Sequence, residues 1–101
     1  MLDYYDKSGK PIDMWEFARL HSDHEYKRIG YDEIGNKRVS TVWLGLNHAI
    51  FPETPILIFE TMVFSGVDNW EDEHMQRYTT EEQAIAGHSN ICEILKVTEE
   101  F

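Results

Sequence analysis

Cysteine is nearly absent from this chain, and so are the signals of several other protein classes. Its 101 residues include one cysteine, Cys92, which excludes an internal disulfide and a zinc site built from several thiolates. No apolar run approaches the roughly 18 residues that span a bilayer. Residues 1–6 are acidic and aromatic, unlike the basic start and apolar centre of a signal peptide. We therefore expect a cytoplasmic protein that does not bind membranes.

Positive charge is also scarce, and it is unevenly distributed. Lysine and arginine number 9 against 19 aspartates and glutamates, for a net charge of −10. Residues 1–38 carry 8 acids and 7 bases, whereas residues 39–101 carry 11 acids and 2 bases. Such a surface repels phosphate backbones, which argues against direct nucleic-acid binding. It favours encounter with a basic protein partner, although it also serves solubility without any partner.

Motifs of established catalytic mechanisms are missing as well. The chain has no His-Glu-x-x-His zinc motif, no glycine-rich phosphate loop and no serine nucleophile elbow. Asp72, Glu73 and His74 are adjacent, but sequence neighbours seldom all reach one ion. His21 and His24 are three residues apart, but a predicted helix end separates them. We therefore predict no metal site and no cofactor.

Two apolar stretches predict the centre of the fold. Residues 39–46 and 56–64 are rich in β-branched and aromatic residues, as strands are, and both are apolar on both faces. Alternation along 56–64 places Glu60 on one face with Met62 and Phe64, and Thr61 on the other. The face with Glu60 is too apolar to be bare, so an N-terminal helix or a second copy of the chain should cover it.

Capping signals predict two helices. Asp13 can cap a helix over residues 14–21. Thr80 and Gln83 form a capping box at the start of a longer helix that runs to about residue 97. The apolar stripe of that helix comprises Ala84, Ile85, His88, Ile91, Cys92 and Leu95. Gly87 adjoins the stripe. A mid-helix glycine costs roughly 1 kcal/mol relative to alanine, so Gly87 either allows close approach to a sheet or is an accidental glycine.

Two polar segments complete the predicted sheet. Residues 26–33 are typical of an edge strand whose charges protect the exposed ladder, and residues 75–78 can form a fourth strand. Gly35 and Asn36 predict a hairpin turn before the central strands. The prediction is a single α+β domain over residues 1–101. It is a three- to four-stranded antiparallel meander with the C-terminal helix packed on one face and a short N-terminal helix.

Three residues, Glu60, His88 and His48, are candidates for catalysis. A carboxylate inside an apolar strand must be paired, hydrogen-bonded or protonated, so Glu60 is either a general base or a structural carboxylate bonded to a group such as Arg77. His88 faces the sheet, where it could meet Glu60 or Thr41 as a general base or be a hydrogen-bonded core histidine. His48 lies in a loop, a frequent place for functional residues and for ordinary ones.

Cys92 and the acidic residues give further candidates. Cys92 could act as a nucleophile beside a histidine, but its place in a buried helix stripe is typical of an unreactive thiol. Trp70 is either a lid over the core or an exposed contact. The candidate binding surface consists of acidic side chains around this tryptophan and at the start of the last helix: Asp68, Trp70, Glu71, Asp72, Glu73, Glu81 and Glu82.

Three sequence blocks carry a resemblance to other proteins. They are STVWLGLNH at 40–48, FETMVF at 59–64 and RYTTEEQAIAGH at 77–88. In this order, and with residues 5–12, they resemble a group of short proteins encoded by bacteriophages and prophages. The resemblance covers the chain from about Tyr5 to His88. It implies a phage-type accessory protein acting in a bacterial host, and it implies no mechanism and no catalytic residue.

These observations favour a non-enzymatic protein that binds a basic host or phage protein through its acidic surface. It would act as an inhibitor or as a decoy that mimics nucleic acid. The rival hypothesis is a small hydrolase-like or metal-dependent enzyme, which requires Glu60, His88 and His48 to converge in one pocket. A third hypothesis is a structural homodimer.

Overall fold

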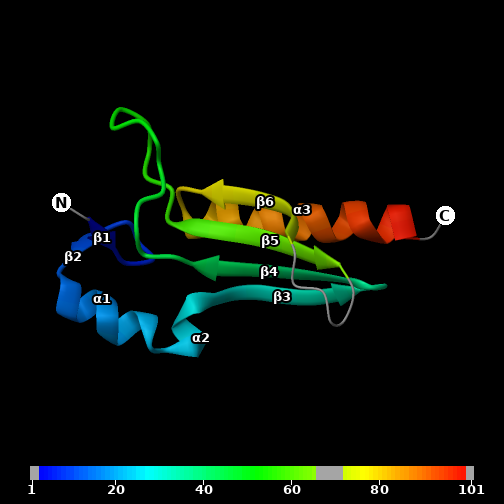
Figure 1. The fold of residues 1–101 in the computed structure, drawn as a ribbon, viewed down its shortest axis with the longest axis horizontal. Coiled ribbons are helices and arrows are strands. Elements are labelled where there is room, and N and C mark those ends of the chain that lie inside the picture. The colour runs from blue at the N-terminus through cyan, green and yellow to red at the C-terminus, as the bar shows by residue number, and fades with distance from the viewer. Residues whose placement is uncertain (1–2, 66–71, 100–101) are drawn as a thin grey trace.

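The computed structural model describes residues 3–65 and 72–99, which form an α+β fold (Figure 1). Four strands pair antiparallel in the order β3-β4-β5-β6, and β1 and β2 form a separate hairpin. The elements are β1 (Tyr4–Tyr5), β2 (Pro11–Ile12), α1 (Met14–His21), α2 (His24–Lys27), β3 (Arg28–Ile34), β4 (Lys37–Trp43), β5 (Phe59–Ser65), β6 (Asp72–Tyr78) and α3 (Glu81–Glu99). The predicted fold class is confirmed. Among the helices in these residues, none has the length and apolar character needed to cross a membrane.

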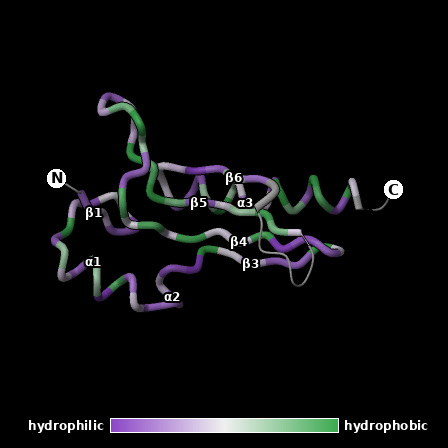
Figure 2. The backbone as a smooth tube through the Cα atoms, in the orientation of Figure 1, coloured by the Kyte–Doolittle hydropathy of each residue, from purple (hydrophilic) through white to green (hydrophobic). Residues whose placement is uncertain are grey.

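β4 and β5 are the central strands, as predicted, although their boundaries differ. They cover 37–43 and 59–65, whereas the apolar stretches cover 39–46 and 56–64. The regular ladder ends near Gly45, which adopts a φ of 80° that other residues rarely adopt. Figure 2 shows hydrophilic colours along much of β3 and β6, as expected for edge strands.

Register fixes which side chains share a face of the sheet. Thr41 pairs with Thr61, and Trp43 pairs with Phe59, so these four side chains point to the same side. Beyond Trp43 the segments that follow β4 and precede β5 stay together through isolated hydrogen bonds, such as that from the Leu44 amide to the Ile58 carbonyl at 2.7 Å. Thr41, Trp43, Ile58, Phe59 and Thr61 are almost completely buried.

β3 begins later than the sequence predicts because one turn of helix precedes it. The Asp23 carboxylate accepts hydrogen bonds from the amides of Glu25 and Tyr26, at 3.1 Å each, and so caps α2. Gly35, with a φ of 60°, makes the predicted turn into β4. β6 is longer than predicted and includes residues 72–74.

Helix α1 spans the predicted residues and packs at one end of the sheet. Asp13 caps it by accepting the Glu16 amide at 2.8 Å. The Phe17 ring stacks on Tyr4 with centroids 4.4 Å apart and lies 5.9 Å from Trp43. Because Trp43 and Met62 point to opposite sides of the sheet, α1 does not cover the face that carries Met62.

Helix α3 runs along the sheet and contacts all four of its strands (Figure 1). The capping box is confirmed: the Thr80 hydroxyl accepts the Gln83 amide at 3.1 Å, and the Gln83 side chain accepts the Thr80 amide at 3.2 Å. Ile85 was predicted to belong to the buried stripe, but it is 53% exposed because it lies at the margin of the face turned to the sheet. The buried part of the stripe is centred on His88.

Candidate functional site

A line of hydrogen bonds crosses the interface between α3 and the sheet. The Tyr78 hydroxyl donates to the Thr61 hydroxyl at 3.1 Å. The Thr61 and Thr41 hydroxyl oxygens lie 2.6 Å apart, and Thr41 Oγ1 lies 2.6 Å from His88 Nδ1. The other ring nitrogen of His88, Nε2, lies 2.7 Å from Asp32 Oδ2. Side chains from β3, β4, β5, β6 and α3 thus form one continuous polar chain.

Two glycines let α3 approach the sheet closely enough for these bonds. Gly30 pairs with Thr41 on the neighbouring strand, and a Cβ at Gly30 would lie 3.0 Å from His88 Nε2. A Cβ at Gly87 would lie 2.3 Å from the Tyr78 hydroxyl oxygen, a distance that real Cβ atoms essentially never show. The close approach predicted from Gly87 is therefore present.

The Asp32 carboxylate determines which nitrogen of His88 carries hydrogen. An ionised carboxylate only accepts hydrogen bonds, so Nε2 carries a proton and donates it to Asp32 Oδ2. In the neutral imidazole, Nδ1 then accepts a hydrogen bond from the Thr41 hydroxyl, whose oxygen can accept one from Thr61. The hydrogen bond from His88 to Asp32 is the main reason that the pKa of Asp32 is lower than usual.

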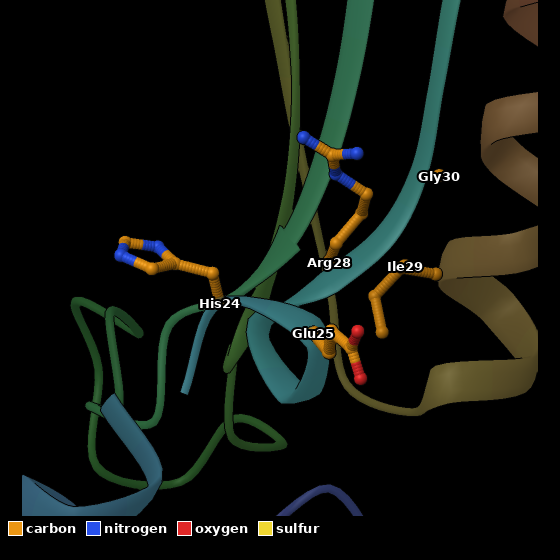
Figure 3. A pocket seen from close by; sticks show the side chains of 5 residues that line it. All are labelled: His24, Glu25, Arg28, Ile29 and Gly30. Carbon is orange, nitrogen blue, oxygen red and sulfur yellow. The ribbon is translucent and has the colours of Figure 1, made fainter. Parts of the chain in front are cut away.

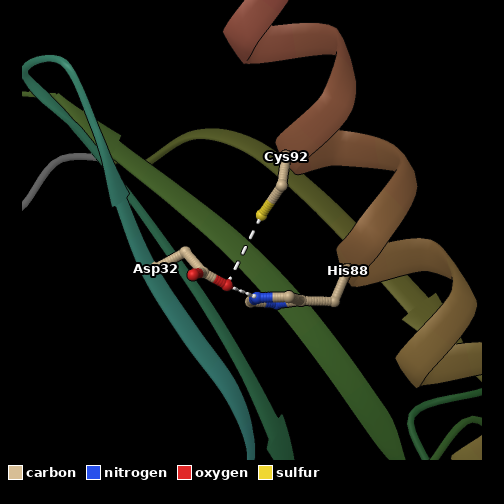
Figure 4. Close-up of side chains that lie close together, drawn as sticks. All are labelled: Asp32, His88 and Cys92. Carbon is tan, nitrogen blue, oxygen red and sulfur yellow. Dashed lines mark hydrogen bonds and ion pairs between the residues drawn. The ribbon is translucent and has the colours of Figure 1, made fainter.

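Cys92 joins the outer end of the chain. It follows His88 by one helical turn, and its Sγ donates to Asp32 Oδ2 across 3.7 Å (Figure 4). Burial, and then the neighbouring Asp32 charge, raise the pKa of the Cys92 thiol. The thiol therefore stays protonated at neutral pH and is a poor nucleophile. The Asp32 side chain is 57% exposed, so these three groups meet where the polar chain reaches the surface.

The order carboxylate, imidazole and hydroxyl is also that of a nucleophilic triad. Here, however, the hydroxyl belongs to Thr41, which is 0% exposed, and its neighbour Thr61 is 0% exposed as well. A substrate would reach Thr41 Oγ1 only if α3 left the sheet. His88 is thus a hydrogen-bonded core histidine, one of the two interpretations that the sequence left open.

Glu60 and His48 do not join this chain, so the convergence required by an enzyme based on Glu60, His88 and His48 does not occur. Glu60 precedes Thr61 in β5 and points to the opposite face of the sheet because side chains alternate. There Arg77 Nε donates to the Glu60 carboxylate at 2.9 Å, which makes Glu60 a paired structural carboxylate. His48 lies in the β4–β5 loop.

That loop projects from the body of the protein (Figure 1). Its Ile50 and Phe51 side chains are 87% and 65% exposed. A hollow of about 370 Å³ lies at its base and is lined by both residues, by His48, and by Arg77 and Thr79 from the end of β6 and beyond. Ile50 and Phe51 were not predicted as functional residues, although an apolar pair beside a proline in a loop was a usable signal.

Five side chains of the predicted acidic surface lie outside the described part of the structure: Asp68, Trp70, Glu71, Asp72 and Glu73. Glu81, at the start of α3, has its carboxylate 3.8 Å from Lys7 Nζ. Glu82 is exposed.

A second hollow of about 370 Å³ lies where α2 meets β3 and is lined by His24, Glu25, Arg28, Ile29 and Gly30. Figure 3 shows the His24 and Arg28 side chains directed away from each other and from Glu25. These polar groups do not converge on one point.

Asp32, Thr61 and Tyr78 are the members of the polar chain that sequence reasoning missed. Alternation alone places Thr61 opposite Glu60, and Thr41 was already a proposed neighbour of His88. Predicting the polar chain also required the register of β3, which no sequence signal supplied. Comparisons of the sequence with protein-family models and curated proteins, and of the fold with solved structures, give no match.

Proposed function

We propose that this chain is a small acidic accessory protein of phage type that acts by binding a partner protein of the host or phage. The binding surface comprises the β4–β5 loop and the start of α3. We call it the loop–helix surface and define it by Ile50, Phe51, Glu53, Glu81 and Glu82. The observation that carries the proposal is the exposure of two large apolar side chains, Ile50 and Phe51, on a projecting loop.

These two side chains are costly to leave in water. Removing a side chain of this size from water is worth about 1.5–3 kcal/mol, and neither Ile50 nor Phe51 belongs to the two core clusters. An aromatic side chain at the centre of an interface is a frequent source of binding energy. Thr79, two residues before Glu81, lines the same hollow as Phe51, which brings the loop beside the start of α3.

The charge around these apolar side chains defines the partner. Glu53 and Glu82 are both exposed, and residues 39–101 carry 11 acids against 2 bases. A complementary partner has an apolar groove bordered by lysine or arginine, and opposite charge increases the rate of encounter. A nucleic-acid-binding site has such basic borders, so the chain would act there as an inhibitor or decoy. The acidic residues around Trp70 would add to the same attraction.

The test is affinity for a purified partner rather than capture alone. The immobilised chain is incubated with bacterial host lysate, the retained protein is identified by mass spectrometry, and its Kd is then measured with wild type and variants. Phe51→Ser should weaken binding about 10-fold or more, as loss of a central interface aromatic does. Val97→Ser is the matched control, because Val97 is 57% exposed on α3 and outside the loop–helix surface.

Salt gives an independent measurement. Binding should weaken as ionic strength rises, and Glu82→Gln should reduce that dependence. Equal effects of Phe51→Ser and Val97→Ser, or a Kd insensitive to salt, would contradict the proposal. If the chain binds only a second copy of itself, through Phe51, the structural homodimer would replace this proposal.

A further inference from the structure

We infer that Asp32, His88 and Cys92 form a binding site for a divalent transition-metal ion, of which zinc is the best match. One ligand atom from each residue lies within 4.8 Å of the others. Figure 4 shows the three side chains directed to one point between β3 and α3. Imidazole, thiolate and carboxylate are the three ligand types that zinc uses in proteins.

Two of the three pairs of ligand atoms already lie near the spacing that an ion requires, and the third pair, His88 Nε2 and Cys92 Sγ, lies within 4.8 Å. Tetrahedral zinc, with bonds of about 2.0–2.3 Å, holds its ligand atoms roughly 3.3–3.7 Å apart. Asp32 Oδ2 is 3.7 Å from Cys92 Sγ and 2.7 Å from His88 Nε2. The carboxylate must therefore withdraw from Nε2 by about half an ångström. It is free to do so because Asp32 is exposed and lies on an edge strand.

The other two ligands are held in place by the fold. His88 and Cys92 are four residues apart on α3 and share one helix face. They are 7% and 6% exposed, so little side-chain freedom remains to be lost on binding. Thr41 Oγ1 lies 2.6 Å from Nδ1 of His88, the position of the outer hydrogen bond that orients metal-bound imidazoles.

Protons and charges balance in this step. The thiol releases its proton to solvent, and the imidazole proton moves from Nε2 to Nδ1. Nδ1 then donates a hydrogen bond to Thr41 Oγ1, and the Thr41 hydroxyl hydrogen turns from Nδ1 to Thr61 Oγ1. The Cys92 thiolate and the Asp32 carboxylate then neutralise the two positive charges of the ion. Lys96 lies one turn beyond Cys92, and its Nζ is 3.7 Å from Glu93 Oε1. The Glu93 carboxylate offsets the repulsion between Lys96 and the metal ion. Three protein ligands leave a fourth position for water, on the exposed side of Asp32.

Titration with Co²⁺ tests the site directly, because a cobalt–thiolate bond absorbs in the near ultraviolet and Cys92 is the only thiol in the chain. Metal-free wild type should develop this absorption band and saturate at one ion per chain. Cys92→Ala should lose the band, and Asp32→Ala should weaken Co²⁺ binding at least 10-fold. His48→Gln removes a histidine outside the cluster and should change neither the absorption band nor the affinity for Co²⁺.

Thermal unfolding with Zn²⁺ supplies a second readout if Cys92→Ala folds poorly. Zn²⁺ should raise the Tm of wild type and of His48→Gln but not that of Asp32→Ala, whose altered side chain is exposed. Absence of the thiolate band in folded wild type would overturn the inference. Saturation at one ion per two chains, or full affinity in Asp32→Ala, would also overturn it.

Discussion

Replacing Thr41 with valine removes one oxygen from the centre of the polar chain while nearly preserving side-chain shape. Thr41 is 0% exposed, so water cannot replace the lost hydroxyl. Its Oγ1 lies 2.6 Å from both Thr61 Oγ1 and His88 Nδ1. Valine therefore eliminates two hydrogen bonds and leaves a hydroxyl proton and a ring nitrogen without partners.

The expected cost is about 2–4 kcal/mol. Each lost hydrogen bond contributes about 1 kcal/mol, and a buried polar group left without a partner costs about 1–3 kcal/mol. Partial rearrangement of the Thr61 hydroxyl keeps the total below the sum of these terms. For a domain of about 100 residues, such a loss lowers the Tm by roughly 10–30 °C.

Urea and thermal unfolding, followed by circular dichroism in chelator-treated buffer, measure this loss. Thr41→Ser is the matched control: it keeps the hydroxyl, loses one methyl group and should cost only about 1 kcal/mol. Combining Thr41→Val with Tyr78→Phe, which removes the first donor of the chain, should cost less than the sum of the two single changes. The reasoning is refuted if Thr41→Val is as stable as Thr41→Ser, because the buried chain would then contribute nothing specific.

Three other perturbations probe the same interface. Gly87→Ala should gain about 1 kcal/mol of helix propensity but lose more to the clash with Tyr78, so its Tm should fall. A higher Tm would show that α3 does not approach the sheet so closely. The hydrogen bond from His88 lowers the pKa of Asp32 from its ordinary value of 3.8. The stability that this bond gives the folded protein is therefore complete above pH 3.8 and is lost as the pH falls through the folded-state pKa. In metal-free urea unfolding, wild type and Asp32→Asn should therefore converge in stability at low pH, and a constant difference would contradict this. Cys92 should react slowly with a thiol reagent until urea unfolds the chain, because it is buried and burial raises its pKa; rapid labelling of the folded protein would argue otherwise.

Local sequence signals predicted the larger elements because those elements depend on neighbouring residues. The capping box of Thr80 and Gln83 sets the start of α3 whatever it packs against, and Asp13 does the same for α1. The single turn α2 was missed because four residues are too few for a periodic pattern. The end of β4 was misplaced because the apolar sequence continues past Gly45, where a positive φ interrupts the strand.

The polar chain could not be predicted in the same way, because it depends on which face each strand turns to α3. Simple alternation puts Asp32 on the same face as Arg28, which pairs with Val42 and points away from the helix. A register shift between Arg28 and Gly30 reverses this order, so that Asp32 pairs with Val39 and points toward α3. A shift of one residue turns every later side chain to the other face. The bulge in β3 thus brings a carboxylate, which would otherwise be an ordinary edge-strand charge, against His88 and Cys92.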